Sequence, residues 1–70
     1  MNMVPVSSSN LAAVGYDPPT ETLRVEFLNG SLYEYKAVPQ GVYDELMAAP
    51  SHGSYFNRFI RNSYAYERIG

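Results

Sequence analysis

Residues 22–28, TLRVEFL, alternate between polar and apolar side chains from Thr22 to Phe27. In an extended chain, Leu23, Val25 and Phe27 fall on one face and the polar residues fall on the other. A period of two predicts a β-strand with one buried face. The preceding segment, residues 10–16, predicts another strand, and the two prolines between these segments predict a turn.

The turn at residues 28–30, Leu-Asn-Gly, decides how this strand pairs with the next predicted strand, residues 31–37. A two-residue Asn-Gly loop would place a glutamate and a lysine on the apolar face. A three-residue loop with a left-handed glycine instead pairs Val25 with Tyr33 and sets an arginine opposite a glutamate on the other face. We therefore predict the three-residue loop, with Tyr33 and Tyr35 in the core rather than on a platform for stacking nucleic-acid bases.

After this hairpin, the apolar residues have the spacing of an α-helix. Val42 and Leu46 lie four residues apart and predict a helix over residues 39–48. Pro39 suits its first turn, and Pro50 ends it.

A second helix is predicted over residues 52–62, with Ser51 as its N-cap. Its apolar residues form a broad face, whereas Asn57, Arg58 and Arg61 lie off that face toward solvent. We expect both helices to cover the apolar face of the strands. The predicted core comprises Leu23, Val25, Phe27, Tyr33, Tyr35, Val42, Leu46, Tyr55, Phe56, Phe59 and Ile60.

These elements predict an α+β fold, in which a three-stranded antiparallel meander carries two helices packed on one face. The tail, SYAYERIG, alternates with a period of two and predicts either a short fourth strand or an extended strap. A chain of 70 residues is expected to form one domain, residues 1–70. Residues 1–5 are expected to be loose, because Pro5 discourages strand pairing.

Composition narrows the classes of function. Seven acidic and five basic residues give a net charge of −2, whereas dedicated nucleic-acid-binding domains are usually basic. The absence of cysteine excludes disulfides and fits a cytoplasmic protein. No apolar stretch approaches the roughly 20 residues that span a bilayer, so no membrane association is expected.

The sequence offers no catalytic constellation. His52 is the only histidine and there is no cysteine, so neither a nucleophile–base pair nor a cluster of metal ligands is predicted. We expect no enzyme activity, no cofactor and no metal site.

The C-terminal end is the only locally basic region, because after residue 50 the chain has three arginines and a single acidic residue, Glu67. Arginine interleaved with tyrosine suits contact with RNA, through phosphate and base stacking, and equally suits a protein interface. A third interpretation is that the arginines bond to the acidic N-terminal half. The candidate binding residues are Asn57, Arg58, Arg61, Tyr64, Tyr66 and Arg68.

Several short motifs in order resemble one known family. They are VPVSSSNL, GYD, LRVEF followed by NG, YEY, GSYFNRFIR and YAYERI, which together extend from about Val4 to Ile69. This ordered set is similar to the KTSC domain, named for the C-terminus of some lysyl-tRNA synthetases and also found as small free-standing bacterial proteins. The resemblance implies RNA binding, as suggested for the family, and places the family's central YxY motif at Tyr33 and Tyr35. It implies no aminoacylation activity.

The expected function is therefore that of a small non-enzymatic accessory domain that binds RNA, weakly, or a ribonucleoprotein partner. In this hypothesis Arg58 and Arg61 contact phosphate and Tyr64 stacks on a base. The alternative is a protein-interaction or homo-oligomeric module without a nucleic-acid role. The sequence leaves the partner and the oligomeric state open.

Overall fold

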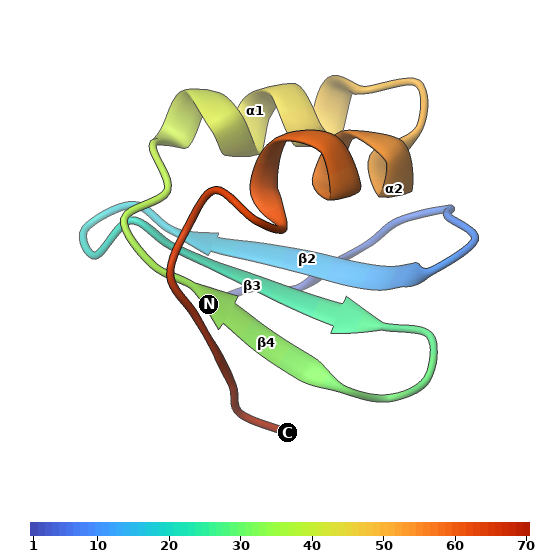
Figure 1. Cartoon of the computed structure of the whole chain (residues 1–70), viewed down its shortest axis with the longest axis horizontal. Coiled ribbons are helices and arrows are strands. Elements are labelled where there is room, and N and C mark those ends of the chain that lie inside the picture. The colour runs from blue at the N-terminus through green and yellow to red at the C-terminus, as the bar shows by residue number, and fades with distance from the viewer.

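A computed structural model describes all residues from 1 to 70. The chain forms a five-stranded antiparallel sheet in the order β1-β2-β3-β4-β5, and its helices lie on one face of that sheet (Figure 1). The strands are β1 Val4–Pro5, β2 Leu11–Asp17, β3 Thr22–Phe27, β4 Leu32–Tyr35 and β5 Tyr66–Arg68. The helical elements are α1 Gln40–Ala48, α2 His52–Tyr55 and a π-helical turn, η1, Phe56–Ile60, which continues α2.

The predicted hairpin register is confirmed. Val25 pairs with Tyr33 across β3 and β4. The Phe27 N–H donates to Ser31 O at 2.9 Å, and Gly30 has a φ of +91°. Glycine adopts that left-handed conformation without the steric cost of a side chain, which permits the three-residue loop.

The α+β fold is as predicted, but the sheet is wider than three strands. The tail supplies β5, the short strand that the alternation of SYAYERIG allowed. Residues 1–5 are not wholly loose, because Val4 pairs with Val14 and Pro5 pairs with Ala13. Since β1 is an edge strand, the missing backbone N–H of a proline is tolerated there.

Nine side chains form the buried core, and six of them were predicted. The predicted Phe27, Tyr33, Val42 and Tyr55 are half-buried and pack against this core. Phe59 is 48% exposed, so its placement in the core was wrong. The nine are Leu11, Val14, Leu23, Val25, Tyr35, Val38, Leu46, Phe56 and Ile60.

The helical layer is tied to the sheet and to itself by polar contacts. Tyr16 of β2 donates its hydroxyl to Val38 O and stacks on Tyr43 of α1, with ring centroids 5.0 Å apart. His52 Nδ1 lies 2.9 Å from Leu46 O, an atom that only accepts, so Nδ1 carries the hydrogen and links α2 to α1. These contacts join the helical layer to β2 and the two helices to each other.

The second helix departs from the predicted continuous α-helix. Ser51 caps it as expected, by accepting from the Ser54 N–H. Beyond Tyr55 the chain enters η1, in which the Arg61 N–H donates to Phe56 O at 2.9 Å. This bond spans five residues rather than four, so the side chains after Phe56 are rotated relative to an ideal α-helix. Within this turn Phe59 is exposed, whereas Phe56 and Ile60 are buried.

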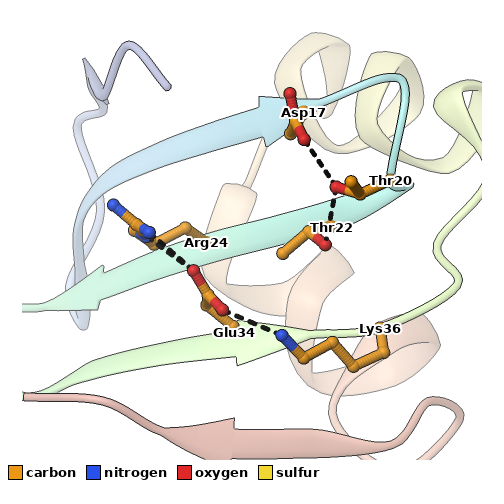
Figure 2. Close-up of polar contacts among 6 residues, drawn as sticks. All are labelled: Asp17, Thr20, Thr22, Arg24, Glu34 and Lys36. Atoms are coloured by element: carbon orange, nitrogen blue, oxygen red, sulfur yellow. Dashed lines mark hydrogen bonds and ion pairs between the residues drawn. The ribbon is translucent and has the colours of Figure 1, made fainter.

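The face of the sheet away from the helices is polar (Figure 2). Glu34 accepts hydrogen bonds from Arg24 at 2.6 and 3.1 Å and from Lys36 at 2.9 Å. These bonds, first that from Lys36 and then that from Arg24, hold the pKa of Glu34 below its ordinary value. The adjacent network joins the Asp17 carboxylate and the hydroxyls of Thr20 and Thr22.

Neither helix has the length and apolar character that crossing a bilayer requires.

The two phenylalanines of η1 differ in burial, so their removal should lower the free energy of unfolding by different amounts. Phe56 is 1% exposed, so Phe56→Ala should lower the free energy of unfolding by about 3–5 kcal/mol. Phe59→Ala removes a ring of the same size from a 48% exposed position and should cost about 1 kcal/mol or less. Urea unfolding followed by circular dichroism measures both, and an equal loss in the two variants would contradict this core.

The lowered pKa of Glu34 predicts how one contribution to stability varies with pH. A carboxylate whose pKa is lowered by folding stabilises the folded state above its unfolded pKa, about 4.3, and loses that effect as the pH falls through the folded pKa. Glu34→Gln should therefore reduce stability at pH 7 by about 1 kcal/mol or less, with the deficit shrinking below pH ~4. Glu26→Gln, on the same strand pair and without an ion pair, is the control. A deficit for Glu34→Gln that grows in acid would show that the sign is wrong.

Candidate functional site

A pocket of about 390 Å³ lies between the helical layer and the β4–β5 side of the sheet. It is lined by residues of β3, β4, β5, the β3–β4 turn and η1, by the residue before β2, and by the two residues after η1. It therefore forms where the two layers meet and the helices leave the sheet partly uncovered.

Aromatic rings from both layers line this pocket and touch one another in a closed circuit. Phe56 from η1 packs edge-on against Phe27 and Tyr35, with ring centroids 5.5 and 5.3 Å apart. Tyr33 packs edge-on against Phe27 at 5.6 Å, and Tyr66 closes the circuit at 5.9 Å from Tyr33 and 5.5 Å from Tyr35. Each such pair contributes about 0.5–1.5 kcal/mol beyond area burial, so the circuit gives the pocket a rigid wall.

The circuit mixes buried and accessible rings. Tyr35 is 4% exposed, as a core residue should be, whereas Tyr66 is 59% exposed. Tyr33 is half-buried. The helices thus cover Tyr35 but leave the surface of Tyr66 and part of Tyr33 open to a bound group.

Three phenol hydroxyls of the circuit have no partner within the chain. Tyr16 and Tyr55 use their hydroxyls in hydrogen bonds to Val38 O and Glu45 Oε1, but the hydroxyls of Tyr33, Tyr35 and Tyr66 make none. No buried side-chain polar atom of the chain lacks a partner, so these three hydroxyls reach solvent. They are available to hydrogen-bond a ligand.

The pKa of Tyr35 shows which charges lie near its hydroxyl. Burial raises this pKa above its usual value, the neighbouring Tyr66 and Tyr33 raise it further, and Arg61 opposes the increase. Tyr35 is therefore a neutral phenol at pH 7, able to donate or accept, with a guanidinium nearby.

Amides and one cation make up the polar part of the lining. Arg61 is the only charged residue among the lining residues, and no carboxylate is present there. The chain has two ion pairs, Arg24–Glu34 and Lys36–Glu34, and neither involves an arginine after residue 50. The C-terminal arginines are thus not bonded to the acidic N-terminal half. The polar lining comprises Asn10, Asn29, Ser31, Asn57, Arg61 and Asn62.

The structure brings together only part of the predicted binding set. Asn57, Arg61 and Tyr66 line the pocket. Arg68 pairs with Tyr33 in the sheet, so its side chain projects from the same face, and its Nε donates to Gly70 O at 2.9 Å. These four of the six predicted binding residues therefore lie on one surface.

Arg58 and Tyr64 lie elsewhere. The Arg58 guanidinium lies 5.4 Å from the centre of the Phe59 ring, outside the pocket lining. Tyr64 is half-buried and packs against the core. Arg58 and Arg61, which were predicted to be neighbours, therefore lie on different surfaces.

The π turn explains this regrouping. In an α-helix with 3.6 residues per turn, positions 58 and 61 are neighbours, whereas positions five apart differ by about 140°. The bond from the Arg61 N–H to Phe56 O instead aligns residues five apart. Arg61 consequently joins Phe56 and Asn57 at the pocket.

The sequence reasoning missed Asn10, Asn29, Ser31 and Asn62 as lining residues. The turn motif places Asn29 in a loop, but no local pattern indicates that Asn10 lies beside it, because the two come from segments that meet only in the fold. The Leu28 N–H donates to Asn10 O at 2.9 Å, which brings the start of β2 beside the β3–β4 turn that carries Asn29. The alternating pattern predicts where the β3–β4 turn lies, but it does not predict that Asn10 lies beside that turn.

Comparisons with known proteins find relatives that align with nearly the whole chain. The model of the KTSC domain family matches residues 7–64. The chain is 48% identical over 61 residues to a lysine–tRNA ligase of Nostoc sp., covering 87% of the chain but only 11% of that ligase. It is 44% identical over 70 residues to an uncharacterised protein of Stutzerimonas stutzeri, with 99% of each chain covered.

A crystal structure of a KTSC domain protein from Yersinia pestis superposes with a TM-score of 0.93 at 34% identity, covering 99% of this chain and 97% of the other. The family match, the relatives and this structure agree with the ordered motifs seen in the sequence. This chain belongs to the KTSC domain family.

Proposed function

We propose that this chain is a small non-catalytic RNA-binding domain, whose pocket receives one unstacked base of a single strand. The observation that carries the proposal is the circuit of five aromatic rings, with three unpartnered phenol hydroxyls beside the unpaired Arg61. The lining holds no histidine, cysteine or carboxylate, which supports binding rather than catalysis.

The geometry supports a single base rather than a duplex. Proteins recognise single-stranded RNA by stacking splayed-out bases on aromatic rings and arginine planes, at about 1–3 kcal/mol per base. A pocket of about 390 Å³ is at the small end of the range for bound organic groups, about 300–1,000 Å³. Tyr66, the most exposed ring, is the proposed stacking surface, and the buried Tyr35 and Phe56 hold it in place.

The acidic net charge of −2 is compatible with this proposal, because the sheet separates the charges. Glu34 is bonded to Arg24 and Lys36 on the face away from the helices, and Glu67 pairs with Glu34 in the sheet and shares that face. The pocket face instead carries Arg61 and Arg68. With so few cationic contacts, binding should be weak, and each contact should add about 0.7 to the salt dependence.

The relatives add independent support. A segment 48% identical to this chain belongs to a lysine–tRNA ligase, a protein whose name includes a transfer RNA. A small domain joined to such a ligase would lie close to RNA. The function of the whole ligase is not transferred, since the chain spans 11% of it.

Two arginines of the same helical segment provide a matched test. Arg61→Glu and Arg58→Glu change the net charge equally, but only Arg61 lines the pocket. Arg61→Glu should weaken binding of a labelled mixed-sequence single strand at low salt by about tenfold or more, as expected for losing one charged hydrogen bond. Arg58→Glu should weaken it only a few-fold, through its charge alone. Fluorescence anisotropy gives both affinities, and thermal unfolding checks that each variant is folded.

Tyr66→Ala completes this test, because it removes the stacking surface from a 59% exposed position. It also removes the contacts of this ring with Tyr33 and Tyr35, so thermal unfolding must show that the variant is folded. It should weaken binding at least as much as Arg61→Glu does. The RNA proposal is wrong if the wild-type chain shows no saturable binding, or if all three variants bind as the wild type does.

A second function, as a protein-interaction module, is favoured by a different surface. Phe59 is 48% exposed, and its ring lies 4.7 Å from the Tyr55 ring and 5.4 Å from the Arg58 guanidinium. Exposed aromatic rings beside arginine are typical of the residues that contribute most to protein interfaces.

The two surfaces can be separated in a native lysate. A partner protein should be recovered with wild-type chain after nuclease treatment, retained by Arg61→Glu and lost with Phe59→Ala. Recovery that disappears on nuclease treatment would instead favour the pocket and RNA. If Phe59→Ala retains every nuclease-resistant partner, the second function is wrong.

A further inference from the structure

We infer that the pocket selects bases with a carbonyl oxygen at C4 of a pyrimidine or C6 of a purine, uracil and guanine, over bases with an amino group at that position, cytosine and adenine. This inference rests on the proposed function and specifies its ligand. It derives from two asparagines, Asn10 and Asn29, whose carboxamides are anchored by their oxygens so that only their NH₂ groups remain available.

The orientation of Asn29 follows from its partners. Its Oδ1 lies 3.0 Å from the Ser31 backbone nitrogen and 2.6 Å from Ser31 Oγ. A backbone N–H can only donate, so the atom facing it must be the amide oxygen. The Nδ2 group has no partner in the chain, and Asn29 lines the pocket. It therefore offers two hydrogen-bond donors and no free acceptor of comparable strength.

Asn10 is oriented by a parallel argument. Ser8 Oγ accepts from the backbone N–H groups of Asn10 and Leu11, at 3.3 and 3.2 Å. The hydroxyl hydrogen of Ser8 remains to be donated, and it points to Asn10 Oδ1 at 3.0 Å. The Nδ2 group of Asn10 is again left without a partner.

The carboxamide of Asn10 is also sterically confined. A Cβ atom at Gly53 of α2 would overlap Asn10 Oδ1, so glycine at this position lets the amide lie against the helix. The backbone of Asn10 is held from the other side, where its carbonyl accepts from the Leu28 N–H. The side chain is thus fixed between α2 and the β3–β4 turn.

The two anchored carboxamides are consequently donors, and the Ser31 hydroxyl, whose hydrogen is used by Asn29, is the one anchored acceptor. Arg61 adds a guanidinium, which donates only, and the phenol hydroxyls adapt because they both donate and accept. Carbonyl oxygens of a base satisfy these donors, whereas an amino group placed against a fixed NH₂ leaves both groups unpaired. Such a mismatch typically changes affinity about tenfold or more per position.

Uridine and cytidine give the sharpest comparison, since the two rings have the same size and differ in a carbonyl against an amino group. Wild-type chain should bind a short labelled oligouridylate about tenfold more tightly than an oligocytidylate of equal length. Oligoinosinate and oligoadenylate, which differ in the same way, should show the same preference. Anisotropy titration at one low salt concentration measures all four.

Asn29→Asp tests the cause of the preference. An aspartate keeps an oxygen to accept from Ser31 and replaces the NH₂ group by a second acceptor, and Asp-Gly suits the same turn. The added negative charge should weaken all binding, so the measured quantity is the ratio of uridylate to cytidylate affinity, which should fall to about one or reverse. Asn2→Asp adds the same charge at an exposed asparagine outside the pocket lining and should leave that ratio unchanged.

Ser31→Ala supplies a variant without a charge change. It removes one of the two hydrogen bonds that orient Asn29 and leaves the backbone bond, so the ratio should fall part of the way. Equal affinities for uridylate and cytidylate, with binding still dependent on Arg61, would overturn the inference and leave the proposed function standing. A ratio that survives Asn29→Asp would also overturn it, and the absence of binding to every oligonucleotide would overturn both.

Discussion

The contact of Phe56 with the sheet is the interaction on which both the fold and the pocket depend. Its ring is 1% exposed and packs edge-on against Phe27 and Tyr35, joining the helical layer to β3 and β4. A chain of 70 residues without cysteine has no disulfide to replace that contact, and a domain of this size has only a few kcal/mol of stability to lose. The inner wall of the pocket is therefore also the centre of the core. Substitutions that probe binding must be made at its accessible members, such as Tyr66, rather than at Phe56.

The sheet also works as a partition between two kinds of surface. Its outer face carries the carboxylate of Glu34 between Arg24 and Lys36, where opposite charges neutralise each other (Figure 2). Its inner face carries the aromatic circuit, and Arg61 stands beside it without a carboxylate partner. An overall negative charge consequently says little about the potential at the pocket, because strand alternation assigns adjacent residues of β4 and β5 to opposite faces.

The strands could be predicted because their physical signals are local. The alternation of β3 and the left-handed Gly30 together select one register, and the pairing of Val25 with Tyr33 follows from them. The edge strand β1 could not be predicted, since two residues carry no period and Pro5 argues against pairing. Leu11 and Val14 were absent from the predicted core because the small residues around them blur the alternation of β2.

The pocket could be predicted only in part, for two different reasons. The Arg and Tyr composition of the C-terminal segment correctly drew attention to Arg61 and Tyr66, which line it. The π turn has no compositional signal, so helical spacing grouped Arg61 with Arg58 and placed Phe59 in the core. Asn10 meets the β3–β4 turn through a backbone bond to Leu28, and a contact between segments so far apart is invisible to any local pattern.

The π turn has a consequence for how this domain can diverge. A π turn amounts to one residue inserted into an α-helix, so deleting one residue between Asn57 and Ile60 would restore regular winding. Arg61 would then lie four residues after Phe56, so its N–H would still donate to the same carbonyl, and the side chains beyond the deletion would keep their orientation over the sheet. A codon could thus be lost or gained in this segment without moving Arg61 away from the pocket, so relatives of this domain can differ in length here and still present the same group at that position.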